Sequence, residues 1–190
     1  GWQGGPQETY RFLQPIATEL LRATAPREGG LPPRIREQTL LDFDGSALLT
    51  AESSAGPIGD VQAMLQPNTD AYYLKLIAGV EESFSDPPGK PKRLFLLANP
   101  AWRDRSSWGW FDGARAQRDV LDRYPTTFAL DQFVVRGQKL SLLRAWPHDW
   151  CVFLTPLDEG SEAREDARLD GSGKAVLLGT SVERPAYKEL

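Results

Sequence analysis

Apolar residues recur at helical spacing near the start of the chain. They lie three or four residues apart on one face of a helix predicted over 7–25. The positions on that face are Tyr10, Leu13, Ala17, Leu20 and Leu21. Pro15 falls inside the pattern and is predicted to kink or divide the helix, because proline lacks the backbone donor that the next turn needs. A second amphipathic helix is predicted over 70–83.

Shorter apolar segments, bounded by Gly, Pro and Asp, predict strands. Arg93–Asn99 is almost continuously apolar, which is typical of a strand covered on both faces. Segments 126–135 and 138–145 flank Arg136-Gly137 and predict a hairpin with glycine at the turn. Asp44-Gly45 is predicted to turn into a short helix through 47–49. The other predicted strands are 34–43, 60–66, 150–155 and 175–180, and the other predicted helix is 113–122.

The order of these elements predicts the fold class. Helices alternate with strands in the first part of the chain, and consecutive strands follow in the last part. This order indicates an α/β (α+β-like) fold, a layered domain with a mixed β-sheet flanked by helices. A length of 190 residues, 41% of them hydrophobic, suits a single domain over 1–190 with its own core. Segment 157–173 is predicted to be a flexible acidic loop within that domain.

Charge is distributed unevenly along the chain. The net charge is −4, and segment 157–170 alone supplies it, with six acidic and two basic residues. Segment 90–123 is mildly basic, with eight basic and four acidic residues. A sequence pI of about 5.1 argues against a dedicated nucleic-acid-binding protein, whose pI usually exceeds about 9. No apolar run approaches the roughly 20 residues that a membrane-spanning helix needs, so any membrane association is expected to be peripheral.

Cysteine and histidine are too few for several kinds of chemistry. Cys151 is the one cysteine, which excludes an internal disulfide and a multi-cysteine metal site. His148 is the one histidine, which excludes a multi-histidine site. The pattern around these residues indicates no catalytic set, no metal site and no cofactor, and it favours a buried, unreactive thiol at Cys151.

Segment 39–46 carries the sharpest catalytic candidate. An apolar strand followed by Asp42, Asp44 and Gly45 is similar to the first motif of haloacid-dehalogenase-type phosphatases. In that interpretation Asp42 attacks phosphorus, Asp44 is the general acid, and both help to hold magnesium. The alternative is a strand-to-helix turn in which Asp44 caps the helix and Gly45 relaxes the backbone. The alternative is favoured because the later lysine and acidic pair of such enzymes have no counterpart in the expected places.

Segment 99–112 connects the strand Arg93–Asn99 to the next helix and is rich in Trp and Arg. Its candidate partner-binding residues are Trp102, Arg103, Arg105, Trp108, Trp110 and Phe111. Trp and Arg are enriched where proteins bind one another, and aromatic rings also stack on nucleotide bases. The tryptophans could instead cover the core of the domain itself, and all three interpretations stay open. The segment is predicted to lie at the carboxyl edge of the sheet, where α/β domains usually carry their functional loops.

Several short features follow one another in a fixed order between residues 93 and 156. They are Arg93-Leu94-Phe95-Leu96-Leu97 leading to Asn99-Pro100, Tyr124, Gly137, Arg144, Pro147 and Trp150-Cys151-Val152-Phe153. Asp44-Gly45-Ser46-Ala47-Leu48 upstream and segment 176–185 downstream continue the series. In these features the chain resembles a plastid and cyanobacterial domain family of unknown function. That family is found in the photosystem II assembly factor Low PSII Accumulation 3 and at the C-terminus of a chloroplast adenylate-kinase-like protein.

The resemblance carries expectations about function. It implies a chloroplast protein, in the stroma or on the stromal face of the thylakoid. There it would be a non-enzymatic accessory protein, a peripheral subunit or assembly factor that binds a photosystem or its assembly intermediate. Neither nucleic acid nor a cofactor is expected. The alternatives are the magnesium-dependent phosphatase using Asp42 and Asp44, and a nucleotide-binding regulatory module suggested by the adenylate-kinase fusion.

Overall fold

The computed structural model describes residues 4–25, 32–41, 44–54, 56–83, 93–156, 174–186 and 188. These residues form two compact units, 1–124 and 125–190, each with its own four-stranded sheet. Helices and strands are both present, which confirms the expected α+β class. The predicted acidic loop 157–173 lies outside the described residues, and the single domain over 1–190 stays a prediction.

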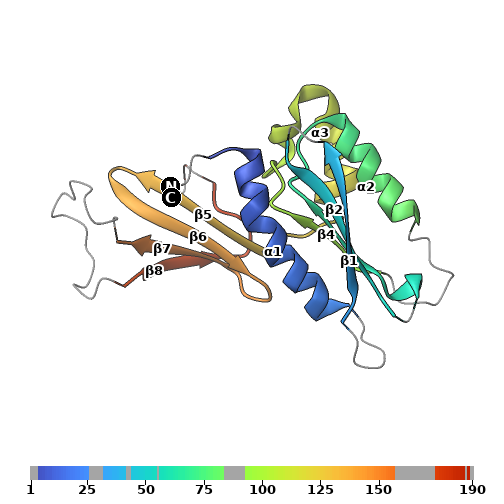
Figure 1. Cartoon of the computed structure of the whole chain (residues 1–190). Helices are drawn as coiled ribbons and strands as arrows, with labels where there is room; N and C mark the ends of the chain where they lie inside the picture. Colours follow the sequence, from blue (N-terminus) through green and yellow to red (C-terminus); the bar gives the residue numbers. More distant parts are fainter. Residues whose placement is uncertain are drawn as a thin grey trace. The chain divides into compact units, whose positions relative to one another are not determined.

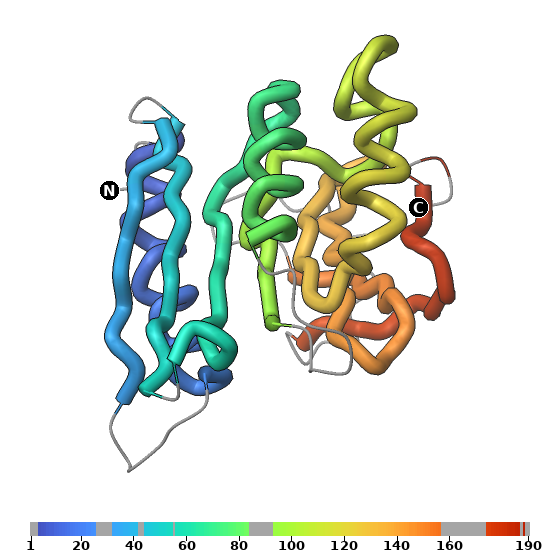
Figure 2. Tube along the Cα trace, turned by 90° about the vertical axis from the view of Figure 1, so that its right-hand side faces the viewer, coloured from blue at the N-terminus to red at the C-terminus, as the bar shows by residue number. Residues whose placement is uncertain are grey.

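The first unit is built on a mixed sheet (Figures 1 and 2). Its strands are β1 (Arg34–Leu41), β2 (Ser46–Glu52), β3 (Val61–Leu65) and β4 (Phe95–Ala98). They lie side by side in chain order, as Figure 2 shows. The β1–β2 and β2–β3 pairs are antiparallel, whereas β3 and β4 are parallel. The predicted mixed sheet is therefore confirmed.

Helix α1 (Pro6–Thr24) covers one face of this sheet (Figure 1). Ala17 and Leu21 are buried there against Leu49 of β2 and Leu65 of β3. Pro15 does not divide the helix, which is assigned without a break through it. Pro15 lies on the exposed side, where water can satisfy the carbonyl group that its missing N–H leaves without a partner.

Helices cover the opposite face as well. They are α2 (Ala71–Ser83) and α3 (Gly109–Ala116), and α3 continues into a π-helical turn over Gln117–Leu121. Because side chains alternate along a strand, Met64 of β3 points to this side while its neighbour Leu65 points to α1. Figure 1 shows the resulting three layers, with α1 on one side of the sheet and α2 and α3 on the other. Strand β4 is covered on both faces, as its continuous apolar sequence predicted.

The prediction of a short helix over 47–49 is wrong, because these residues belong to β2. Ala47 pairs with Thr39 of β1 on one side and with Leu65 of β3 on the other. Ladders of hydrogen bonds to two neighbouring strands outweigh the local helix preference of an Ala-Leu-Leu sequence. Asp44 therefore belongs to a turn between two strands and caps no helix.

The second unit is an antiparallel sheet in chain order. Its strands are β5 (Phe128–Val135), β6 (Gln138–Ala145), β7 (Trp150–Thr155) and β8 (Val176–Ser181). The predicted hairpin at Arg136-Gly137 is confirmed, and both turn residues have positive φ angles of 51° and 79°. Cys151 is half-buried in β7, and His148 is exposed in the preceding turn.

Candidate functional site

The carboxyl ends of β3 and β4 meet at one edge of the mixed sheet, because these two strands are parallel. Strand β4 ends at Ala98, and Asn99 follows in a left-handed conformation with φ of 52°. The Ala98 carbonyl accepts from the Gln66 N–H at 2.9 Å, and the Ala101 N–H donates to the Pro67 carbonyl at 2.9 Å. These bonds fix the start of segment 99–112 at the carboxyl edge, which confirms its predicted place.

Two of the three tryptophans in this segment belong to the core. Trp102 and Trp108 are only 8% and 5% exposed, and their ring centroids lie 4.8 Å apart. They pack with Tyr73 of α2 and Val120 of the π-helical turn in the cluster beneath α2 and α3. For these two residues the structure shows the core-covering role that the sequence had left as one of three interpretations.

A 3₁₀ turn over Arg105–Trp108 joins this buried pair to α3. Asp104 caps the turn, since its Oδ1 accepts from the Ser106 N–H at 2.8 Å. Gly109 then redirects the chain into α3 with a φ of 69°, a conformation that suits glycine. At Gly113 an added Cβ would lie 3.2 Å from the Arg105 backbone oxygen, so α3 packs tightly on the 3₁₀ turn at this point.

Trp110 and Phe111 point away from this support. Their side chains are 91% and 93% exposed, although large aromatic side chains are usually among the most buried groups of a protein. They lie in the first turn of α3, whose Ala116 faces the core. Arg103 and Arg105 are also exposed. The predicted set of six residues thus divides into two buried residues, Trp102 and Trp108, and four exposed ones.

The Asp44 turn lies at the same edge, because β2 begins beside the end of β3. Its carboxylate accepts from three donors: the Ser46 N–H at 2.9 Å, the Asn68 amide at 3.0 Å and the Tyr73 hydroxyl at 2.5 Å. Burial raises the pKa of Tyr73, and its hydrogen bond to Asp44 raises the pKa further. Asp42, the other acid of the phosphatase-like motif, lies outside the described residues.

This arrangement gives Asp44 a structural role. A general acid must reach the leaving group, whereas the Asp44 carboxylate is directed at donors from β2, α2 and the connection between β3 and α2. Sequence reasoning missed its partners Asn68 and Tyr73. Asn68-Thr69-Asp70 before a helix is a capping signal, but nothing in the pattern links it to a residue 24 positions away.

The rest of the described chain offers little for metal or membrane chemistry. Among the residues whose structure is described, no three His, Cys, Asp or Glu side chains lie close enough together to hold a metal ion. Within the same residues, no helix is long and apolar enough to span a bilayer.

The chain belongs to the family described as Domain of unknown function (DUF1995), whose sequence profile matches residues 10–190. The comparison with curated proteins found no match, and neither did the comparison with solved structures. The match shows which family the chain belongs to, and the description of that family assigns no activity.

Proposed function

We propose that this protein is a non-enzymatic accessory protein that binds a protein partner through Trp110 and Phe111. The observation that carries the proposal is the exposure of two adjacent aromatic side chains, 91% and 93%, at the start of α3. Exposing two large aromatic rings to water is unfavourable, and burying them against a partner recovers that free energy. Interface hot spots are enriched in such residues.

The support beneath the pair favours binding. The buried rings of Trp102 and Trp108 and the capped turn between them hold the start of α3 in place. A partner therefore meets a preorganised surface, and little conformational entropy is lost on association. Arg103 and Arg105 lie exposed in the same segment and can bind carboxylates at the rim of an interface.

The proposed setting is photosynthetic. We place the protein in the chloroplast, in the stroma or on the stromal face of the thylakoid, as a peripheral subunit or an assembly factor. Its partner would be a photosystem or an assembly intermediate of one. This setting rests on the resemblance of residues 93–156, whereas the exposed aromatic pair supports only the binding of a protein.

The experiment is affinity purification of the tagged chain from thylakoids solubilised in mild detergent. The test variant replaces Trp110 and Phe111 by Ala, and the matched control replaces Trp146, which is 69% exposed in the turn after β6. We expect the test variant to lose its partner and the control to keep it. A loss of about 2 kcal/mol or more, the usual hot-spot threshold, corresponds to roughly 30-fold weaker binding of the isolated partner.

Two results would overturn the proposal. If the double variant retains the same partner, Trp110 and Phe111 are not part of the interface. Recovery of soluble stromal proteins alone, with no photosystem subunit, would refute the photosynthetic setting while leaving the binding surface intact. Circular dichroism of each variant checks that its fold is unchanged, which we expect because neither exposed ring packs in the core.

A further inference from the structure

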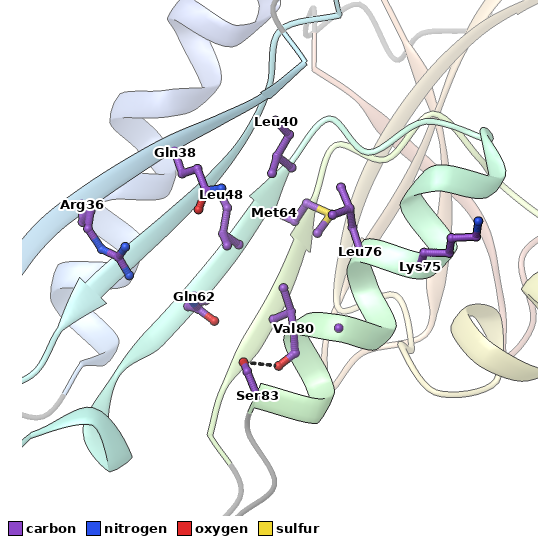
Figure 3. A pocket seen from close by; sticks show the side chains of 11 residues that line it. Arg36, Gln38, Leu40, Leu48, Gln62, Met64, Lys75, Leu76, Val80 and Ser83 are labelled. Atoms are coloured by element: carbon purple, nitrogen blue, oxygen red, sulfur yellow. Dashed lines mark hydrogen bonds between the residues drawn. The ribbon is translucent and has the colours of Figure 1, made fainter.

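A groove lies on the α2 side of the mixed sheet, between α2 and β1 (Figure 3). Its volume is about 320 Å³, at the lower end of the range for small-molecule sites. Its floor is formed by side chains of β2 and β3, and its walls by β1 and α2. The groove lies entirely within the first unit and shares no lining residue with segment 99–112.

The strand register divides the groove into a polar end and an apolar end. Arg36 of β1 pairs with Thr50 of β2, which pairs with Gln62 of β3, so three polar side chains form one row. The next row on the same face contains Gln38, Leu48 and Met64. Beyond it lie Leu40 and, from α2, Leu76, as Figure 3 shows. From Arg36 to Leu40 the groove extends roughly 13 Å at 3.3 Å per residue.

The polar end contains one hydrogen-bonding atom without a partner among the described residues. The Gln62 amide donates to the Thr50 hydroxyl at 2.8 Å, while its oxygen is buried without a hydrogen-bond partner among the described residues. Such an atom is unfavourable unless something binds to it or the amide turns over. Turned over, the amide would accept from the Thr50 hydroxyl and place its NH₂ group at that buried position beside the groove.

The polar end contains one cation that can bind an anion. None of the residues lining the groove is acidic. Glu52 accepts from the Nε of Arg36 at 3.0 Å, which leaves the two terminal nitrogens of the guanidinium for another acceptor. Lys75 also borders the groove, but Figure 3 shows its side chain directed away from β1. Arg36 is therefore the cation placed to bind a carboxylate.

Gly79 gives a second, independent indication that the groove is kept open. It lies in the interior of α2, where glycine destabilises a helix relative to alanine. No atom lies within 4 Å of the position that a Cβ would take, so packing does not require glycine here. Gly79 nevertheless lines the groove, and a side chain at this position would narrow it.

We propose that this groove binds a small amphipathic carboxylic acid. The carboxylate lies at Arg36, and the apolar chain runs over Leu48 toward Met64 and Leu76. At the packing density of protein interiors the groove holds on the order of 240 Å³ of ligand van der Waals volume. Dodecanoate, a linear acid of about that size, is a suitable probe.

The test is titration calorimetry of the full chain with dodecanoate, with dodecanol and dodecyltrimethylammonium as ligands of the same chain length and different head groups. We expect saturable binding of dodecanoate at one site and binding at least about tenfold weaker for the other two ligands. Arg36→Gln should weaken dodecanoate binding about tenfold and leave dodecanol unaffected. Equal affinity for all three ligands, or no saturable binding of dodecanoate, would overturn the proposal.

Gly79 supplies the matched pair of variants. Gly79→Phe should fill the groove and abolish dodecanoate binding, whereas Gly79→Ala should keep it and raise the melting temperature. Dodecanoate binding to Gly79→Phe with unchanged affinity would place the ligand elsewhere and refute the site. If Gly79→Phe fails to fold, Arg36→Gln still decides the question, because the Arg36 side chain is mostly exposed and its loss leaves the core intact.

Discussion

The hydrogen bond between Tyr73 and Asp44 provides a direct test of whether Asp44 is structural. The Tyr73 hydroxyl donates to the Asp44 carboxylate at 2.5 Å and lies 2.6 Å from the Ser46 hydroxyl oxygen. Tyrosine has a single hydroxyl proton, so Ser46 must donate to Tyr73 while Tyr73 donates to Asp44. Two variants address this chain of bonds, Asp44→Asn and Tyr73→Phe.

The magnitudes follow from the bonds that each change removes. Tyr73→Phe deletes one hydrogen bond to a charged group, with a net contribution of about 1.5–3 kcal/mol, and leaves the buried Ser46 hydroxyl without its acceptor. Asp44→Asn keeps the bond from the Ser46 N–H but presents an NH₂ group to two donors, Asn68 and Tyr73. We expect that change to cost about 2–4 kcal/mol. The double variant should cost less than the sum, because both single changes remove the same bond.

The measurement is urea unfolding followed by tryptophan fluorescence, whose signal includes the buried pair Trp102 and Trp108. Each variant should shift the midpoint and leave the denaturant dependence of the free energy unchanged. Tyr72→Phe is the matched control, because Tyr72 precedes Tyr73 in α2 and its hydroxyl makes no hydrogen bond to any described residue. We expect that control to change stability by less than about 0.5 kcal/mol.

The opposite result would restore the enzyme interpretation. Residues held in place for catalysis commonly leave stability unchanged or improved when they are replaced. If Asp44→Asn is as stable as the natural chain, and if a magnesium-dependent phosphatase activity disappears with it, the structural account of Asp44 is wrong. The same assay applied to Asp42→Asn separates the two acids, and we expect it to show no change in any hydrolysis.

Two further predictions concern the backbone and alkaline pH. Gly45→Ala should lower the melting temperature more than Gly109→Ala, since the two glycines have similar φ angles of 66° and 69° but only at Gly45 would the new Cβ lie 2.8 Å from a backbone oxygen. Equal shifts would show that this contact relaxes freely. Burial, followed by hydrogen bonds to carboxylates, raises the pKa of Tyr10, Tyr73 and Tyr124 above the unfolded value of about 10. The stability they contribute is thus fully present below that pH and is lost as the pH rises through the folded values, so their tyrosinate absorbance should appear only as circular dichroism is lost.

The sequence predicted most elements because their apolar patterns have a clear period. Helix α1 and the hairpin of β5 and β6 are where the pattern placed them, within one or two residues. The error at 47–49 arose where local preference and tertiary pairing disagree, since Ala and Leu favour helices while β2 is held between two neighbouring strands. For Pro15 the sequence did not decide between a kink and a break, because the outcome depends on which side of the helix meets water, and the sequence alone does not show that side.

The groove could not be predicted from the sequence either. Its polar row joins Arg36, Thr50 and Gln62 from three strands, and their common face depends on a register that the sequence does not specify locally. Gly79 carried the one available signal, a glycine inside an amphipathic helix pattern. That signal has a meaning only once the open space beside it is known.

Segment 99–112 shows why composition can locate a functional region without resolving its residues. Trp102, Trp108 and Trp110 fall in a connection without a regular period, so no helix or strand pattern separates an inward side chain from an outward one. The 3₁₀ turn and Gly109 make that separation by changing the direction of the chain between Trp108 and Trp110. The positions of the two pairs also depend on each other. The buried pair, Trp102 and Trp108, fixes the turn from which the exposed pair, Trp110 and Phe111, projects. Truncation of Trp102 should therefore weaken partner binding through the fold, whereas truncation of Trp110 should weaken it with the fold intact, and only the second outcome marks a contact residue.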